Sequence, residues 1–261
     1  MTPEELLALA HDAARAAGEL LRDLATRPAE GVRSKSTATD LVSEADLAAE
    51  RAIRAVLGGR RPGDTLLGEE GGEHPLGEAG ATGVRWVVDP LDGTVNFLFG
   101  IPQWCVSVAC EDADGTIAGV VYDVPRDETF AATRDGVPTL DGEPISCSGR
   151  DDLAQAMVAT GFAYDAGLRA RQAEIALAVL PRVRDLRRFG AAALDLCWTA
   201  CGRVDAYYER GLQPWDMAAG ALICERAGVI VRELPARDGM PAGALAAPPA
   251  IAGELHALVG R

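Results

Sequence analysis

The amino-acid sequence predicts an α/β fold, a layered sandwich in which helices cover sheets. Two observations predict it: short β-rich runs separated by Gly, Pro and Asp turns fill residues 65–133, and segments with helical periodicity precede and follow them. No linker, repeat or low-complexity block divides the 261 residues. We therefore expect a single domain over 1–261, with two subdomains at about 1–145 and 146–261.

The first elements along the chain are two predicted helices. Thr2 can cap the first one, and apolar residues recur on one face until about Pro28. Ser43, followed three residues later by Asp46, resembles a capping box that opens a second helix through Leu57. We expect the two helices to pair as an antiparallel hairpin.

A run of predicted strands follows, and after it come further helices and two more strands. The runs TLLG, VRWVVD, WCVSVAC, TIAGVVYDV and ETFAAT predict strands at 65–68, 84–89, 104–110, 116–124 and 128–133. The Gly-rich segment 71–83 predicts a surface loop. Later helices are expected at 169–180, 191–201, 216–227 and 249–260, and strands at 206–209 and 229–232.

Composition and charge exclude several classes of function. Asp and Glu outnumber Lys and Arg by 39 to 25, and a net charge near −14 disfavours nucleic acid as a partner. No apolar run is long enough to span a membrane, and the N-terminus lacks the features of a secretory signal. We expect a cytoplasmic protein that does not bind membranes.

Cysteine and histidine offer little material for catalysis or metal binding. The six cysteines form no C-x-x-C pair, so buried free thiols are expected rather than zinc ligands or disulfides. The three histidines, His11, His74 and His256, lie far apart in the sequence. A histidine-based metal site or a Ser-His-Asp triad is therefore not expected.

Three clusters of carboxylates stand out instead. Glu69 and Glu70 follow the predicted strand TLLG, which alone is typical of a solvated turn. Asp89 and Asp92 flank Pro90-Leu91 at the end of an apolar strand, a pattern that also fits a β-turn with surface acids. Asp216 stands where a helix begins, as an ordinary capping residue would.

The second cluster has the geometry of a metal and phosphate site. A Pro-kinked turn aims Asp89 and Asp92 at one region, and the Leu91 carbonyl has no obvious partner, which together offers three hard oxygen ligands of the kind Mg²⁺ requires. Gly93 and Thr94 present backbone N–H groups beside them that can hold a phosphate.

In combination, these motifs resemble the inositol monophosphatase family of metal-dependent, lithium-sensitive phosphomonoesterases. The order is G-E-E at 68–70, D-P-L-D-G-T at 89–94 and W-D at 215–216. The resemblance extends through the segments 40–46, 141–145, 160–162, 190–196, 202–209 and 214–220. It covers nearly the whole chain and fades after about Val231. It implies an αβαβα sandwich of the sugar-phosphatase type.

The resemblance also implies a set of metal ligands. Glu69, Asp89 and the Leu91 carbonyl would hold a first Mg²⁺, and Asp89, Asp92 and Asp216 a second, with a third, weaker ion near Glu69 in some members. The first ion would activate a water molecule and the second would stabilise the departing alkoxide.

Roles for the remaining site residues follow from the same resemblance. Thr94, with Glu69 and Asp46, would orient or deprotonate the attacking water, although a plain turn cap also explains this threonine. The implied substrate-binding residues are Asp92, Gly93, Thr94, Ala192, Glu209 and Asp216. Lys35 matches a basic residue on a loop over the metals or is a solvated charge. Arg187 and Arg188 either recognise an anionic part of the substrate or pair with surface acids.

These assignments predict Mg²⁺-dependent hydrolysis of the phosphate monoester of a small polyol, with myo-inositol monophosphate as the expected substrate, by a lithium-sensitive homodimer. The alternatives are a fructose-1,6-bisphosphatase or dual-activity enzyme, a histidinol-phosphate phosphatase, a nucleotide 3′-phosphatase, and a non-catalytic protein-binding member of the fold. The last would have broken ligands, whereas Glu69, Asp89, Asp92, Thr94 and Asp216 are all present.

Overall fold

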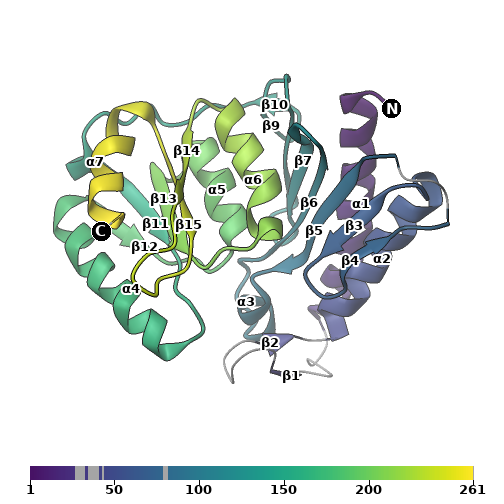
Figure 1. Ribbon diagram of the computed structural model, residues 1–261, viewed down its shortest axis with the longest axis horizontal. Coiled ribbons are helices and arrows are strands. Elements are labelled where there is room, and N and C mark those ends of the chain that lie inside the picture. The colour runs from purple at the N-terminus through teal and green to yellow at the C-terminus, as the bar shows by residue number, and fades with distance from the viewer. Residues whose placement is uncertain (27–32, 35–40, 43, 79–81, 261) are drawn as a thin grey trace.

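A computed structural model describes residues 1–26, 33–34, 41–42, 44–78 and 82–260. Two large sheets and the helices around them form five layers, so the α/β sandwich predicted from the sequence is confirmed (Figure 1). One helical layer covers the outer face of the first sheet, a second lies between the sheets, and a third covers the second sheet. Ser43 and Lys35 lie outside the described residues, and so does the predicted helix end at Pro28.

The outer layer on the first sheet contains α1 (Pro3–Leu24) and α2 (Glu44–Arg60), which pack against each other. The predicted cap of α1 is present: the Thr2 hydroxyl accepts the amide of Glu5 at 3.3 Å, and the Glu5 carboxylate accepts the amide of Thr2 at 2.8 Å. The apolar face of α1 is buried against β6 and β7. The helix therefore forms where its capping box and its amphipathic pattern coincide.

The first sheet has the strand order β10-β9-β8-β7-β6-β5-β3-β4 and is antiparallel except for the pair β3–β5. Its strands are β3 (Thr65–Gly68), β4 (Gly72–Pro75), β5 (Arg85–Asp92), β6 (Cys105–Asp112), β7 (Gly115–Asp123), β8 (Glu128–Thr133), β9 (Thr139–Leu140) and β10 (Glu143–Pro144). The segment 71–83 is thus not only a loop, because β4 pairs with β3 as the edge strand. A two-stranded pair, β1 (Arg33–Ser34) and β2 (Leu41–Val42), stands apart.

Strand β5 differs from the sequence prediction in a way that matters for the site. It was expected to end at Asp89, but it continues through Pro90 to Asp92, and its register with β6 shifts between the two aspartates. Proline has no N–H for the ladder, so the pairing is interrupted locally while the strand goes on. The short helix α3 (Thr94–Leu98) follows at once.

The second sheet has the order β12-β11-β13-β15-β14. Its strands are β11 (Met157–Thr160), β12 (Asp185–Arg187), β13 (Ala206–Arg210), β14 (Ile230–Leu234) and β15 (Gly243–Ala247). Helices α5 (Ala192–Ala200) and α6 (Pro214–Arg226) lie between the sheets, and α4 (Ala166–Val179) and α7 (Pro249–Val259) cover the far side. Two 3₁₀ turns, Leu153–Gln155 and Leu180–Arg182, complete the described elements.

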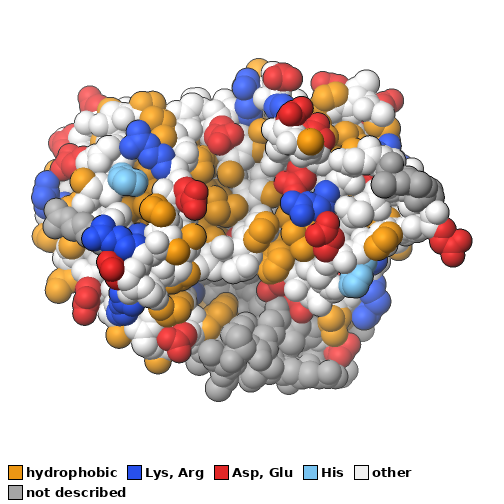
Figure 2. Space-filling view, in the orientation of Figure 1, with side chains coloured by type: hydrophobic (Ala, Val, Ile, Leu, Met, Phe, Trp, Pro, Cys, Tyr) orange, Lys and Arg blue, Asp and Glu red, His pale blue; other side chains and the backbone are white. Residues whose placement is uncertain are grey.

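Other sequence expectations can be checked against the described residues. All six cysteines are free thiols, four of them buried. No helix in the described ranges is both long and apolar enough to cross a membrane. On the face that Figure 2 shows, Lys and Arg side chains are scattered among Asp and Glu side chains.

Candidate active site

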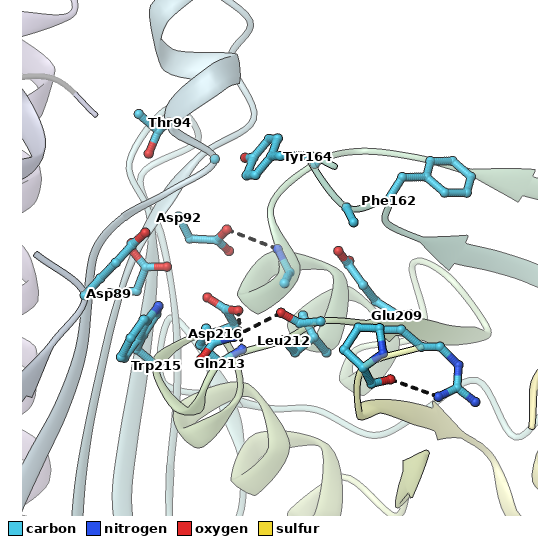
Figure 3. A pocket seen from close by; sticks show the side chains of 18 of the residues that line it. Asp89, Asp92, Thr94, Phe162, Tyr164, Glu209, Leu212, Gln213, Trp215 and Asp216 are labelled. Carbon is cyan, nitrogen blue, oxygen red and sulfur yellow. Dashed lines mark hydrogen bonds between the residues drawn. The ribbon is translucent and has the colours of Figure 1, made fainter. Parts of the chain in front are cut away.

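A cleft of about 550 Å³ lies where the end of β5 approaches the first turns of α5 and α6. Figure 3 shows Asp89, Asp92 and Thr94 on one wall and Glu209 on the other. The cleft brings together most of the residues predicted to form the site: Glu69, Asp89, Leu91, Asp92, Gly93, Thr94, Ala192, Glu209 and Asp216. Asp46 does not line the cleft but contacts it through Thr94.

The turn after β5 is fixed by its own hydrogen bonds. The Asp89 carboxylate accepts the amide of Leu91 at 3.0 Å, and the Leu91 carbonyl accepts the Thr94 hydroxyl at 3.0 Å. That carbonyl therefore has a side-chain partner, although the sequence offered none. Gly93 has φ 92°, and a Cβ there would lie 2.8 Å from the Gln103 carbonyl oxygen, so the turn requires glycine.

Thr94 joins this turn to helix α2. Its hydroxyl lies 2.8 Å from the carboxylate of Asp46, and both side chains are buried. The hydroxyl lies between two acceptors, Asp46 and the Leu91 carbonyl, which share its single proton, and both of its lone pairs can accept a hydrogen bond. A simple turn cap would contact only its own turn, whereas Thr94 also contacts Asp46 on α2.

Asp92 provides the missing cap of a neighbouring helix. Helix α5 has no side-chain cap of its own, and the Asp92 carboxylate accepts the amides of Ala193 at 2.7 Å and Ala192 at 3.2 Å. Burial raises the pKa of Asp92 to about 6, although the two amides act in the opposite direction. The Ala192 amide, predicted to contact substrate, is therefore engaged by Asp92 here.

Two further aspartates face the same space. Burial raises the pKa of Asp89 well above its usual value, and the nearby charges of Glu69, Asp92 and Asp216 raise it further. Burial also raises the pKa of Asp216, and so does the charge of Asp92. Asp216 caps α6 by accepting the amide of Gln213 at 2.7 Å, so its capping role and its place in the cleft coexist.

This wall fits a hard divalent cation in its donor chemistry. It offers carboxylate and carbonyl oxygens, with neither histidine nor thiolate as a lining group. Within the described ranges, no group of three or more acidic, histidine or cysteine side chains could hold a metal ion as it stands. Burial and the charges of neighbouring acids raise the pKa values of Asp89, Asp92 and Asp216, and a bound cation would favour their ionised forms.

The opposite wall carries Glu209 on β13. Burial raises the pKa of Glu209 to about 7, while a 2.8 Å hydrogen bond from the Tyr207 hydroxyl and the charge of Arg188 act in the other direction. Arg188 lines the cleft, whereas Arg187 forms an ion pair with Asp185 at the surface. Arg187 therefore pairs with a surface acid, as one of the two alternatives expects, and Arg188 has a place in the cleft.

Sequence reasoning missed several residues of this site. The outer cleft is also lined by side chains that no motif marked: Tyr164, Leu168, Leu212, Gln213 and Pro241. Phe162 and Trp215 line it as well, and both lie in the motif segments 160–162 and 214–220. Asp195 lies behind the wall, fully buried, with neither carboxylate oxygen hydrogen-bonded to any described residue, and burial raises its pKa. In the sequence, Asp195 stood out only as a member of the motif segment 190–196.

The chain is similar to known proteins in both sequence and fold. The sequence profile of the inositol monophosphatase family matches residues 2–260. The chain is 44% identical to the inositol-1-monophosphatase of Mycobacterium leprae, over 99% of this chain and 94% of that protein. It is 40% identical to the Nus factor SuhB of Pseudomonas aeruginosa, over 88% and 86%. The crystal structure of the extragenic suppressor protein suhB from Bartonella henselae superposes with a TM-score of 0.88 at 34% identity, covering 98% of each chain.

Proposed function

Because the chain belongs to the inositol monophosphatase family, and so is a phosphoric monoester hydrolase, we propose that it hydrolyses a small polyol phosphate, namely myo-inositol monophosphate, with Mg²⁺. The observation that carries this proposal is the wall of buried acids, Asp89, Asp92 and Asp216, which face one cleft and whose pKa values are raised by burial and by the charges of neighbouring acids. Such a wall is costly unless cations occupy it.

Five groups would hold the ions. Glu69, Asp89 and the Leu91 carbonyl suit a first Mg²⁺, and Asp89, Asp92 and Asp216 suit a second, with Asp89 shared between them. When bound, the ions would lower the pKa of a water molecule and neutralise charge on the phosphate and on the leaving oxygen.

Thr94 and Asp46 would orient the attacking water. Asp46 accepts the hydrogen bond of the Thr94 hydroxyl, which leaves the threonine oxygen to accept one from water at the floor of the cleft. The backbone amides of Gly93 and Thr94, at the start of α3, would donate to the phosphate oxygens.

Glu209 would recognise the polyol. Its carboxylate lines the cleft opposite the acidic wall and is oriented by Tyr207. An ionised carboxylate accepts hydrogen bonds from hydroxyl groups, which a polyol provides in abundance. Glu209 and Arg188 are charged groups of the cleft lining that can select a substrate. Asp165 and Arg210 line the cleft as well, but Asp165 caps α4 and Arg210 donates to the carbonyls of Pro235 and Pro241.

Other functions receive less support. Fructose bisphosphate and histidinol phosphate would present a second phosphate or an imidazole to the same wall, and only assay distinguishes them. The relative named Nus factor SuhB favours a protein partner as a second candidate role for this chain. A purely non-catalytic role is disfavoured because every proposed metal ligand is present.

Phosphate release from a panel of substrates tests the proposal. The panel contains myo-inositol 1-phosphate, fructose 1,6-bisphosphate, histidinol phosphate and adenosine 3′,5′-bisphosphate, each with Mg²⁺ and with chelator. We expect the highest kcat/KM for the inositol phosphate and no turnover in chelator. A higher kcat/KM for another substrate would reassign the substrate, and turnover that survives chelation would remove the metal from the mechanism.

A further inference from the structure

Helix α2 directs a second acidic side chain toward the site, one turn after Asp46. Glu50 is 5% exposed, although it lies in the charged sequence EADLAAER. Its spacing of four residues from Asp46 places both acids on one face of the helix. That face also buries Ala45, Ala49 and Ile53, so Glu50 extends the buried surface rather than a solvated one.

Glu50 binds the backbone of the turn that carries Glu69. One oxygen of its carboxylate, Oε2, accepts the amide of Glu70 at 2.9 Å and the amide of Gly71 at 3.2 Å. Hydrogen bonds to a charged acceptor in a buried place are stronger than neutral ones. The turn is therefore fastened to α2 immediately after Glu69.

The sequence of the turn leaves room for this carboxylate. Cβ atoms at Gly68 and at Gly71 would both overlap the carboxylate of Glu50. Neither glycine has a positive φ, so neither is required by backbone conformation. Gly68 and Gly71 are therefore explained by the Glu50 carboxylate, which occupies the space that a side chain at either position would need.

Glu69 is thus held from two sides. Its own amide donates to the Val88 carbonyl of β5 at 3.3 Å, one residue before Asp89, and the next two amides donate to Glu50. The backbone that presents Glu69 is fixed relative to the strand that presents Asp89. Both residues belong to the first proposed Mg²⁺ site.

We propose that Glu50 is a positioning residue that holds Glu69 in place for the metal. The proposal rests on the proposed function, because it requires Glu69 to be a ligand. Glu50 itself touches neither metal nor substrate and acts through the turn. Partners of this kind, one contact removed from a metal, typically change metal affinity by about 10–100-fold when they are lost.

Two substitutions separate the hydrogen bonds from the negative charge. Glu50→Ala removes the acceptor, and we expect the Mg²⁺ concentration for half-maximal activity to rise about tenfold or more, with kcat at saturating Mg²⁺ within about threefold of wild type. Glu50→Gln keeps a carbonyl oxygen that can accept both amides, and we expect a rise of about threefold or less. Mg²⁺ should also raise the Tm of wild type most, that of Glu50→Gln slightly less and that of Glu50→Ala least. This rise in Tm does not depend on turnover.

Asp205→Ala is the matched control. Asp205 is also buried, and it accepts the amide of Met157 at 2.8 Å, in the second sheet and outside the cleft. Its loss should lower Tm in chelator without changing the response to Mg²⁺. If Glu50→Ala behaves like this control, Glu50 is merely structural and the proposal is wrong.

The remaining outcomes are equally decisive. If Glu50→Gln loses as much Mg²⁺ affinity as Glu50→Ala, the charge rather than the hydrogen bonds matters, and positioning is refuted. If Glu50→Ala does not fold, Glu50→Asp replaces it, because the shorter side chain keeps the charge and loses its reach to the two amides. A melting response to Mg²⁺ that needs about tenfold more ion then supports positioning, and a response equal to wild type refutes it. If the wild-type protein itself shows no response to Mg²⁺, the proposed function fails first, and the role of Glu50 with it.

Discussion

Replacing Asp92 by asparagine perturbs the acidic wall at its most constrained carboxylate. Asp92 is 8% exposed and accepts two amides from the first turn of α5. Asparagine keeps the size of the side chain and one acceptor oxygen, but it removes the negative charge. We expect the variant to lose turnover and, without metal, to be more stable than wild type.

The gain in stability follows from the pKa of Asp92. Burial raises it from 3.8 to about 6, so the stabilising effect of the protonated form is lost as the pH rises through 6. Above that pH the ionised carboxylate destabilises the fold by roughly 3 kcal/mol. Asparagine has one acceptor oxygen for the two amides, so one amide is left without an acceptor, which offsets about 2 kcal/mol of this. The net gain of about 1 kcal/mol corresponds to a rise in Tm of about 2–4 °C.

The loss of turnover follows from the same charge. Asp92 is a proposed ligand of the ion that stabilises the leaving oxygen, and electrostatic stabilisation of this kind is typically worth about a hundredfold or more in rate. The assay combines kcat for phosphate release with thermal melts in chelator at pH 7.5 and at pH 5. The stability difference between variant and wild type should narrow at the lower pH.

Asp114→Asn is the control, since Asp114 is an exposed acid on the turn between β6 and β7. It removes the same charge outside the cleft and should change neither kcat nor Tm appreciably. The reasoning would be refuted if Asp92→Asn retained near-normal kcat, or if it lost its cooperative melt in chelator. Asp92 would then be a structural residue of the turn.

Three further predictions concern neighbouring groups. Thr94→Val removes the hydrogen bonds to Asp46 and to the Leu91 carbonyl, so kcat should fall about a hundredfold with little change in KM and with a cooperative melt retained. A raised KM at unchanged kcat would instead give Thr94 a role in substrate binding. Tyr207→Phe removes the hydrogen bond that lowers the pKa of Glu209. The acidic limb of a plot of KM against pH, near pH 7 in wild type, should therefore move to higher pH. A limb that does not move would show that Glu209 does not bind the polyol. Millimolar Li⁺ should inhibit phosphate release, as the family resemblance implies, and full activity in Li⁺ would mark a divergent member.

The fold could be predicted from the sequence where local pattern and packing agree. The capping residues and the apolar face of α1 predict a helix, and the β-branched residues of β6 and β7 predict strands. Strand β15 could not be found this way, because its sequence GALAA has no β-branched residue and favours a helix. It is a strand because β13 and β14 pair with it on both sides.

The acidic residues of the site could be predicted from the sequence, but the residues that hold them in position could not. The spacing of Asp89 and Asp92 around Pro90 indicated two acids aimed at one region, and both line the cleft. Glu50 lies on a helix where a glutamate normally faces solvent, and nothing local distinguishes it. Only the tertiary contact between α2 and the turn after β3 shows that it is buried and bound to amides.

The acids of the cleft are proposed to hold the ions that drive hydrolysis. Crystals soaked with Mn²⁺, which takes the same oxygen ligands as Mg²⁺ and scatters anomalously, test it most directly. We predict anomalous peaks about 2 Å from the carboxylates of Asp89, Asp92 and Asp216 and from the Leu91 carbonyl, with Glu69 completing the first site. Crystals that bind Mn²⁺ only elsewhere, or that leave these acids without a peak at saturating Mn²⁺, would contradict the account.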